Sequence, residues 1–407
     1  MQRRSFLTAA GAAGVSLGLA GCEGLVGDGA DTPTSTTAST DTPTDTPVDL
    51  PSEWASPNMG MWGWTARSVA YAADQLGVEV QLAAIGQGGQ TWDRITNWRR
   101  FRGFDEWVRN GENRWYLPHA PLVVGAEVTA EDREPTDRER REAWRRAADG
   151  AFDDKWRRFA ETFADRGFDH TNCILRLSNE FTGGFHKHGT FNTDGEMVVP
   201  PADFVETYRR TVEIIRSEMG PVHTVWAPTL GRDVADTKAN YPGRDYAVLG
   251  VDVYDDGLAY GSPKFAPDGI DYHRALARGN TRNVRRVREF VWNRRVLAGR
   301  RQDSPGFGLN DLAEMQSEHD APVCIPEWGL RWRESGYGGQ DNPYFVRKMW
   351  EWMNDHEAVF HSYFNHADSA GSVQIAPPSH DIPKARRAFK STFGSVGAHP
   401  MPRMRRR

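Results

Sequence analysis

From Pro51 to about Gly394, short apolar runs alternate with longer amphipathic segments. The short runs have the length and the Val, Ile, Leu and aromatic content of buried strands, and the segments between them have the length of helices. Eight runs are candidate strands: Asn58–Trp64, Val78–Ile85, Leu122–Ala126, Cys173–Leu177, Val222–Ala227, Val248–Val253, Val323–Ile325 and Val359–Phe364. This alternation is typical of repeated βα units that build a parallel sheet.

The helical segments carry their apolar residues on one face. The clearest spans Arg138–Arg166, with a stripe made of Trp144, Ala148, Phe152, Trp156, Phe159 and Phe163. Eight strands with intervening helices fit one closed (β/α)8 TIM barrel, of the α/β class, over residues 51–395. An open doubly wound sheet has the same pattern, but Gly86–Gly89 lacks the spacing of a dinucleotide-binding loop, which disfavours a nucleotide-binding sheet.

The first 22 residues form a separate region. Arg3-Arg4 is followed by a weakly apolar run, rich in Ala and Gly, and then by Gly21-Cys22. This pattern resembles a twin-arginine export signal with a lipobox, in which Cys22 is lipidated after cleavage. The run is too short and too rich in glycine for a stable membrane-spanning helix. We therefore expect an exported, extracellular protein anchored to the membrane through a lipid on Cys22. An ordinary signal peptide with an incidental cysteine is the alternative.

Residues 23–50 and 396–407 are expected to lie outside the folded domain. The first segment consists mainly of Thr, Asp, Pro, Ser and Gly, which predicts a disordered tether, and the second is a short basic tail. The chain has 50 basic and 55 acidic residues and no basic stripe interleaved with aromatics, so a nucleic-acid partner is not expected. Cys173 and Cys324 each lie within an apolar run, which predicts buried thiols and no disulfide framework.

Two glutamates stand immediately after candidate strands, Glu180 after the fourth and Glu327 after the seventh. In a parallel barrel these strand ends lie on the face that carries the active site. Glycoside cleavage needs two carboxyl groups, one that donates a proton and one that acts as nucleophile or base. Each glutamate alone could be a solvated loop residue or a charge at a helix N-terminus. Their joint placement, with Asn179 before one and Trp328-Gly329 after the other, favours catalysis.

These strand ends resemble those of the retaining glycoside hydrolases with (β/α)8 barrels, and among them glycoside hydrolase family 26, which includes β-mannanases. The resemblance rests on Arg176, Glu180, Gly183 and Gly189, and on the run Tyr241–Tyr246 that leads to Gly250–Tyr254. The family usually has His where this chain has Asn179, and an aromatic-rich stretch where it has Phe185–His188. The resemblance therefore implies a glycosidase without naming its polysaccharide.

The resemblance also implies roles for individual residues. Glu180 would be the general acid/base and Glu327 the nucleophile. Asn179 would hydrogen-bond the sugar 2-hydroxyl, while Arg176 and Tyr254 would orient Glu327 and keep it ionised. Because the acid must hold a proton near neutral pH, we expect burial or a neighbouring carboxylate to raise the pKa of Glu180.

Aromatic and histidine side chains near strand ends are further candidates for substrate contacts. Tryptophans stand at or just beyond candidate strand ends at Trp62, Trp64, Trp92, Trp226, Trp328 and Trp332. We predict that Trp226 and Trp328 form walls of sugar subsites, because flat rings stack on sugar faces. His186 is predicted to contact the sugar. Together with His188, His361 and His366 it could also suggest a metal site, but His-x-His lacks a third ligand at a known spacing.

The sequence thus predicts a monomeric, cofactor-free, retaining glycoside hydrolase that cleaves a β-linked extracellular polysaccharide of mannan, glucan or xylan type. Two alternatives stay open. The same barrel could be a surface lipoprotein that only binds glycans, or the chain could be an unrelated barrel hydrolase that uses a metal.

Overall fold

The computed structural model describes residues 58–63, 66–85, 92, 96, 108–109, 112–113, 122–129, 135–301 and 304–394. The chain divides into two units, residues 1–44 and 45–407, and every described residue belongs to the second. The predicted export signal, Cys22, the tether and the basic tail therefore lie outside the described residues. Within the described part of the chain, no helix has the length and apolar character needed to span a bilayer.

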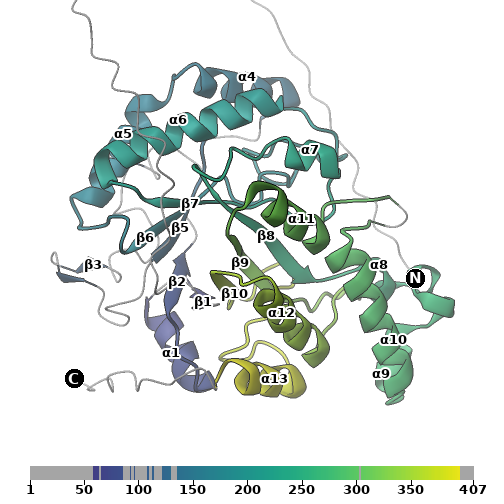
Figure 1. Cartoon of the computed structure of the whole chain (residues 1–407). Coiled ribbons are helices and arrows are strands. Elements are labelled where there is room, and N and C mark those ends of the chain that lie inside the picture. The colour runs from purple at the N-terminus through teal and green to yellow at the C-terminus, as the bar shows by residue number, and fades with distance from the viewer. Residues whose placement is uncertain are drawn as a thin grey trace, which may run out of the picture. The chain divides into compact units, whose positions relative to one another are not determined.

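Eight parallel strands close into a barrel in the order β1-β10-β9-β8-β7-β6-β5-β2 (Figure 1). They are β1 (Asn58–Trp62), β2 (Leu82–Ile85), β5 (Leu122–Ala126), β6 (Cys173–Leu177), β7 (His223–Trp226), β8 (Val248–Asp255), β9 (Val323–Leu330) and β10 (Phe360–Phe364). Each predicted run overlaps one of these strands, and the TIM-barrel prediction is confirmed. A small hairpin, β3 (Val108–Arg109) and β4 (Glu112–Asn113), lies in the segment between β2 and β5.

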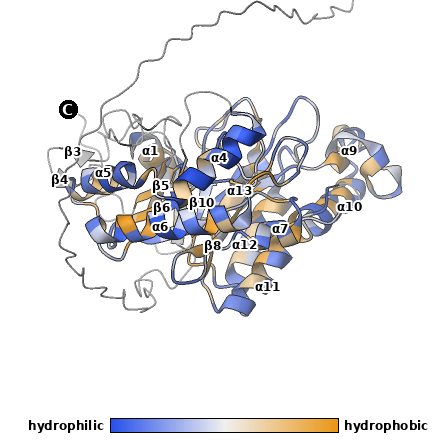
Figure 2. Cartoon of the chain, turned by 90° about the horizontal axis from the view of Figure 1, so that it is seen from above, coloured by the Kyte–Doolittle hydropathy of each residue, from blue (hydrophilic) through white to orange (hydrophobic). Residues whose placement is uncertain are grey.

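Helices surround the barrel, as Figure 1 shows. They are α1 (Ala66–Leu76), α4 (Asp137–Ala148), α5 (Asp153–Ala164), α6 (Pro201–Met219), α7 (Val234–Lys238), α8 (Leu258–Gly261), α9 (Tyr272–Ala277), α10 (Thr281–Val291), α11 (Leu309–His319), α12 (Pro343–Asp355) and α13 (Pro383–Phe393). The helices turn apolar faces to the strands, and the outer surfaces of α4 and α5 are largely hydrophilic in Figure 2. This is the layered packing that amphipathic helices impose on a parallel barrel.

The helical stretch predicted over Arg138–Arg166 is two helices, α4 and α5. Helix α4 begins at a capping box in which the Thr136 hydroxyl accepts from the Glu139 amide and the Glu139 carboxylate accepts from the Thr136 amide. It ends before Gly150, whose φ of 87° lies in the left-handed region that a helix cannot continue through. The apolar stripe resumes on α5. The periodicity of the apolar residues therefore did not reveal the break between the two helices.

Side chains of successive strand residues point alternately into the barrel and towards the helices. On β6, Ile174 belongs to the small cluster inside the barrel, whereas Cys173, Leu175 and Leu177 belong to the large core under the helices. By the same alternation, Arg176 points inwards at the carboxyl end of the strand. Cys173 and Cys324 are buried free thiols, as predicted.

The segment between β8 and α11 is a long helical excursion. It contains α8, α9 and α10, two short 3-10 turns, η3 (Pro263–Phe265) and η4 (Pro267–Gly269), and a π-helical continuation of α10, η5 (Trp292–Leu297). A cluster of its own holds it together, made of Ala259, Tyr260, Ala266, Ile270, Tyr272, Ala275, Val284, Val287 and Val291. In Figures 1 and 2 it stands to one side of the barrel.

Asp255, the last residue of β8, generates a prediction about pH and stability. Its buried carboxylate accepts hydrogen bonds from the Tyr260 hydroxyl (2.8 Å) and the Asn342 amide (2.9 Å). Burial outweighs these bonds and raises the pKa of Asp255 from 3.8 to about 7. The folded state therefore binds this proton more tightly than the unfolded chain. The resulting stability is fully present below about pH 4 and is lost as the pH rises through about 7.

We expect the Asp255→Asn variant to lack this pH-dependent component, which amounts to roughly 4 kcal/mol. Urea denaturation between about pH 4 and pH 8 measures it as the difference between the two proteins in the pH slope of the free energy of unfolding. The slope is the readout because the substitution also changes a hydrogen bond. Parallel pH profiles for the two proteins would contradict the assignment.

Candidate active site

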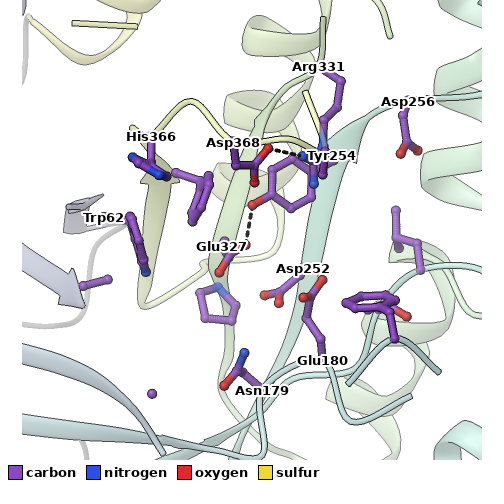
Figure 3. A pocket seen from close by; sticks show the side chains of 18 of the residues that line it. Trp62, Asn179, Glu180, Asp252, Tyr254, Asp256, Glu327, Arg331, His366 and Asp368 are labelled. Carbon is purple, nitrogen blue, oxygen red and sulfur yellow. Dashed lines mark hydrogen bonds and ion pairs between the residues drawn. The ribbon is translucent and has the colours of Figure 1, made fainter. Parts of the chain in front are cut away.

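A cavity of about 540 Å³ lies at the carboxyl ends of the barrel strands (Figure 3). Its lining includes Arg176, Asn179, Glu180, Tyr254 and Glu327. These residues come from the carboxyl ends of β6, β8 and β9; β8 and β9 are neighbours in the barrel, and β7 lies between β6 and β8. The barrel therefore brings together two carboxylates that are far apart in the sequence.

Two donors hold the Glu327 carboxylate. Arg176 Nη1 donates to Glu327 Oε2 at 2.8 Å, and the Tyr254 hydroxyl donates to Glu327 Oε1. Burial, reinforced by the negative charge of Glu327, raises the pKa of Tyr254 well above 10, so the phenol keeps its proton. Two charge-assisted or phenolic hydrogen bonds fix the direction of both carboxylate oxygens. Glu327 is thus a buried, oriented carboxylate facing the cavity.

Arg176 also binds a second acid, Asp252. Each terminal guanidinium nitrogen donates to a different acid: Nη1 to Glu327 and Nη2 to Asp252. Asp252 and Glu327 are register partners on β8 and β9, so the strand pairing itself sets both acids beside the arginine. Asp252 was not among the predicted site residues, and only its inward parity on β8 could have indicated it.

Arg331 holds Tyr254 in place. Its guanidinium carbon lies 3.5 Å from the centre of the Tyr254 ring, a cation–π contact. The same guanidinium donates to the Ser372 hydroxyl and pairs with Asp368 at 3.5 Å (Figure 3). Arg331 therefore fixes the position of the tyrosine ring whose hydroxyl binds Glu327. Sequence patterns gave no signal for Arg331 or Asp368.

The backbone around Glu180 is bent and tied to both neighbouring strands. Ser178 (φ 48°) and Glu180 (φ 52°) both adopt the left-handed conformation, which costs a non-glycine residue on the order of 1 kcal/mol. The Ser178 amide donates to Ala126 O at 2.7 Å, and the Glu180 amide donates to Ala227 O at 2.8 Å. These bonds to the ends of β5 and β7 hold the strained turn and fix where the Glu180 side chain begins.

His186 binds the Glu180 carboxylate, with Nε2 and Oε2 3.0 Å apart. Burial is the largest influence on the Glu180 pKa and raises it, but the hydrogen bond and charge of His186, with Arg176 and Arg331, lower it below its usual 4.5. Burial lowers the pKa of His186, and the bond and charge of Glu180 raise it above 6.5. The prediction that Glu180 has a raised pKa is therefore wrong, because His186 and the two arginines outweigh the effect of burial. The lowered pKa of Glu180 and the raised pKa of His186 both favour a proton on His186 over one on Glu180.

A second Glu–His pair supports the first. His188 Nε2 lies 2.9 Å from the Asn179 carbonyl, which can only accept, and His188 Nδ1 lies 2.7 Å from Glu127 Oε2. The two imidazole rings are stacked, with centroids 4.9 Å apart. Ligand atoms of Glu127, His186 and His188 lie within 4.8 Å of one another and could hold a metal ion. Glu127 follows β5, so only the fold supplies this third group.

The prediction that Trp226 and Trp328 form walls of sugar subsites is wrong. Both side chains are completely buried and belong to the core between the strands and the helices. Trp226 donates to Asn240 O, and Trp328 donates to His361 Nδ1. Each occupies an outward position, next to the inward Val225 and Glu327, and a ring without exposed surface cannot stack on a sugar.

An aromatic wall does line the cavity, but on β1 and β10. Trp62 packs on Phe364 with ring centroids 4.4 Å apart and on His366 at 5.7 Å. All three line the cavity, and Trp62 and His366 lie on the side opposite Asp256 in Figure 3. Trp62 was one of the strand-end tryptophans in the sequence, and its inward parity distinguishes it from Trp226 and Trp328.

Comparison of the sequence with protein-family models gives no match, and comparison with curated proteins gives none either. Solved structures share the barrel. A modular endo-β-1,4-mannanase of glycoside hydrolase family 26 from Cellulomonas fimi aligns with a TM-score of 0.52 at 14% identity, over 85% of this chain and 73% of that one. The catalytic domain of a family 26 endo-β-1,4-mannanase from Bacillus sp. JAMB-750 aligns with a TM-score of 0.52 at 13% identity, over 83% of this chain and 85% of that one. At these identities the likeness shows a shared fold, the (β/α)8 barrel of family 26 mannanases.

The shared proton of His186 and Glu180 can be measured directly. In the wild-type protein, His186 should titrate above 6.5, because the Glu180 charge outweighs the effect of burial. In Glu180→Gln the charge is gone and burial dominates, so the His186 pKa should fall below 6.5. Histidine NMR titration follows the ring resonances. An unchanged His186 titration in the variant would contradict the pairing, and the resonances of distant histidines serve as internal controls.

Proposed function

We propose that the chain is an exported retaining glycoside hydrolase that cleaves β-glycosidic bonds of an extracellular polysaccharide. One observation carries this proposal: Glu180 and Glu327 line the same cavity at the strand ends, and side chains of different kinds contact their two carboxylates. Glu327 is held by donors that favour a charged carboxylate, Arg176 and Tyr254. Glu180 is paired with a group that carries a proton, His186. A nucleophile and a proton donor need these two different environments.

In the first step, Glu327 attacks the anomeric carbon while the bond to the departing oxygen breaks. Glu180 gives that oxygen a proton, which reaches Glu180 from His186 along their hydrogen bond. The glycosyl group is then an ester of Glu327. In the second step, the Glu180–His186 pair accepts a proton from water, the water oxygen bonds to the anomeric carbon, and Glu327 leaves as a carboxylate.

Substrate contacts in this proposal come from both sides of the cavity. Asn179 precedes the acid/base and would hydrogen-bond the sugar 2-hydroxyl, a contact that strengthens in the transition state. Trp62 and Phe364 offer aromatic faces for a sugar ring. The barrel neighbours are endo-β-1,4-mannanases, which supports a β-linked backbone of mannan, glucan or xylan type.

A metal-dependent barrel hydrolase is the second candidate, because Glu127, His186 and His188 present three ligand atoms together. A metal there would compete with Glu180 for His186. Activity abolished by a chelator and restored by Zn²⁺ would favour that candidate over the two-carboxylate mechanism.

The catalytic pair yields a direct test of the proposal. Glu180→Gln should lower kcat on the cleaved polysaccharide by about 10²- to 10⁴-fold, because the leaving group receives no proton. Glu327→Gln should abolish turnover, because no glycosyl-enzyme forms. Reducing-end release measures both, and NMR of the first product should show the retained β anomer. Glu334→Gln, an exposed carboxylate further along the same strand-end segment, is the matched control.

Near-wild-type hydrolysis by either active-site variant would refute the proposed roles. Binding of β-glycans without release of reducing ends by the wild-type protein would instead favour a surface protein that only binds glycans. Circular dichroism of each variant shows whether a loss of activity comes from loss of the catalytic group or from unfolding.

We propose further that Cys22 carries a lipid that anchors the exported protein to the membrane, on the basis of the pattern from Arg3-Arg4 to Gly21-Cys22. Expressed in a host with twin-arginine export, the wild-type chain should fractionate with membranes. Cys22→Ser should be released from the membrane fraction. Equal membrane association of the two proteins would exclude the lipid anchor.

A further inference from the structure

A second cavity adjoins the candidate active site. It has a volume of about 810 Å³ and is formed mainly by the excursion between β8 and α11. Asp256, Arg295, Arg301 and Arg333 line both cavities, so the two are neighbouring parts of one cleft. A glycan chain that enters the first cavity has room to extend into the second.

The lining of this second cavity is strongly cationic. Among its described residues, six basic side chains face a single acid, Asp256; they are Lys264, Arg294, Arg295, Arg300, Arg301 and Arg333. The whole chain has a net charge of −5, so this excess is local and does not follow from composition. Asp256 is already engaged, since it pairs with Arg333 at 3.1 Å and with Arg295 at 3.8 Å. The lining therefore has more basic than acidic side chains.

Three guanidinium groups gather where the two cavities meet, those of Arg232, Arg295 and Arg301. Arg232 is 7% exposed, and its side chain makes no hydrogen bond or ion pair with any described residue. Its guanidinium carbon instead lies 5.8 Å from the centre of the Phe191 ring. Burial, followed by the charges of Arg301 and Arg295, lowers the pKa of Arg232 to about 10. A buried guanidinium beside two other cations is costly unless an anion binds near it.

The backbone makes room for these guanidinium groups. Gly195 (φ 93°) lies against Arg232, and Gly231 (φ 87°) lies against Arg295. At either position a Cβ atom would collide with a guanidinium nitrogen, and the left-handed backbone would itself strain a larger residue. The two glycines therefore leave space that the guanidinium groups of Arg232 and Arg295 occupy.

We propose that this cleft accommodates an anionic glycan, whose carboxylate or sulfate groups are bound by Arg232, Arg295 and Arg301 beside the catalytic pair. The inference rests on the proposed function, because it identifies the substrate class of the same site. Guanidinium forks match the planar geometry of carboxylates and the oxygens of sulfates. Phe265, Phe290 and Tyr337 line the second cavity and offer apolar faces to the sugar rings between the acidic groups.

The test measures binding separately from hydrolysis. In the full-length Glu180→Gln protein, isothermal titration calorimetry compares three probes: polyuronate oligosaccharides, sulfated oligosaccharides of similar length, and neutral manno-oligosaccharides. Polyuronates or sulfated glycans should bind at least about tenfold more tightly than the neutral probe. The advantage should shrink as NaCl rises from about 50 mM to about 500 mM. The stronger of the two anionic probes identifies which group the cleft takes.

Arg301→Glu is the main variant, because Arg301 is exposed and its substitution leaves the core intact. It should weaken binding of the anionic probe by at least about tenfold and leave the neutral probe unchanged. Arg278→Glu, an exposed arginine that lines neither cavity, is the matched control. Arg232→Gln adds the buried member of the cluster, with thermal denaturation to show that it folds.

The outcomes separate this inference from the proposed function. Equal affinity for neutral and anionic probes, or no effect of Arg301→Glu, would overturn the inference while leaving hydrolysis of a neutral glycan by the wild-type protein untouched. Salt-sensitive binding of the anionic probe that Arg301→Glu removes, without hydrolysis by the wild-type protein, would uphold it and overturn the glycosidase. Tighter binding of duplex DNA than of any glycan, lost in the same variant, would overturn the glycan assignment.

Discussion

The candidate site depends on one buried guanidinium, that of Arg176. It binds Glu327 and Asp252, so a single cation on β6 ties together the ends of β8 and β9. All three side chains are almost entirely buried. Ions taken out of water are tolerated only with partners in good geometry, and losing one member of such a group typically costs about 3–5 kcal/mol. Loss of Arg176 would therefore leave two buried carboxylates without their shared cation.

Other supports around the cavity extend this constraint. Arg331 clamps the tyrosine that binds one face of Glu327, and Asp368 and Ser372 hold Arg331. On the opposite wall, Glu180 is fixed by backbone bonds to β5 and β7 and faces His186. The two glutamates consequently have different neighbours, a guanidinium and a phenol for one and an imidazole for the other. That asymmetry, more than the presence of two carboxylates, is what gives them different chemical roles.

The barrel and the excursion after β8 form different parts of the cleft. The barrel sets the carboxylates, and the excursion adds a cationic extension of the cleft that shares Asp256 with it. The excursion has its own small core, so its helices can carry many arginines on their cavity side without help from the barrel interior. A site for chemistry and a site for substrate charge can thus vary independently, as is common where loops decorate the carboxyl ends of barrel strands.

The sequence by itself determined the eight strands and placed Glu180 and Glu327 near strand ends, because apolar runs and their spacing are local properties of the chain. It favoured a closed barrel over an open sheet, but only the pairing of β1 with β10 and β2 closes it. It did not determine which of two adjacent strand-end side chains points inwards, so Trp226 and Trp328 were misplaced while Trp62 lines the cavity. It also could not supply the pKa of Glu180, because the decisive neighbour is an imidazole brought in by a folded loop. Only the tertiary structure gathers Arg232, Arg295 and Arg301, since charge clustering depends on distances in space that separation along the chain does not encode.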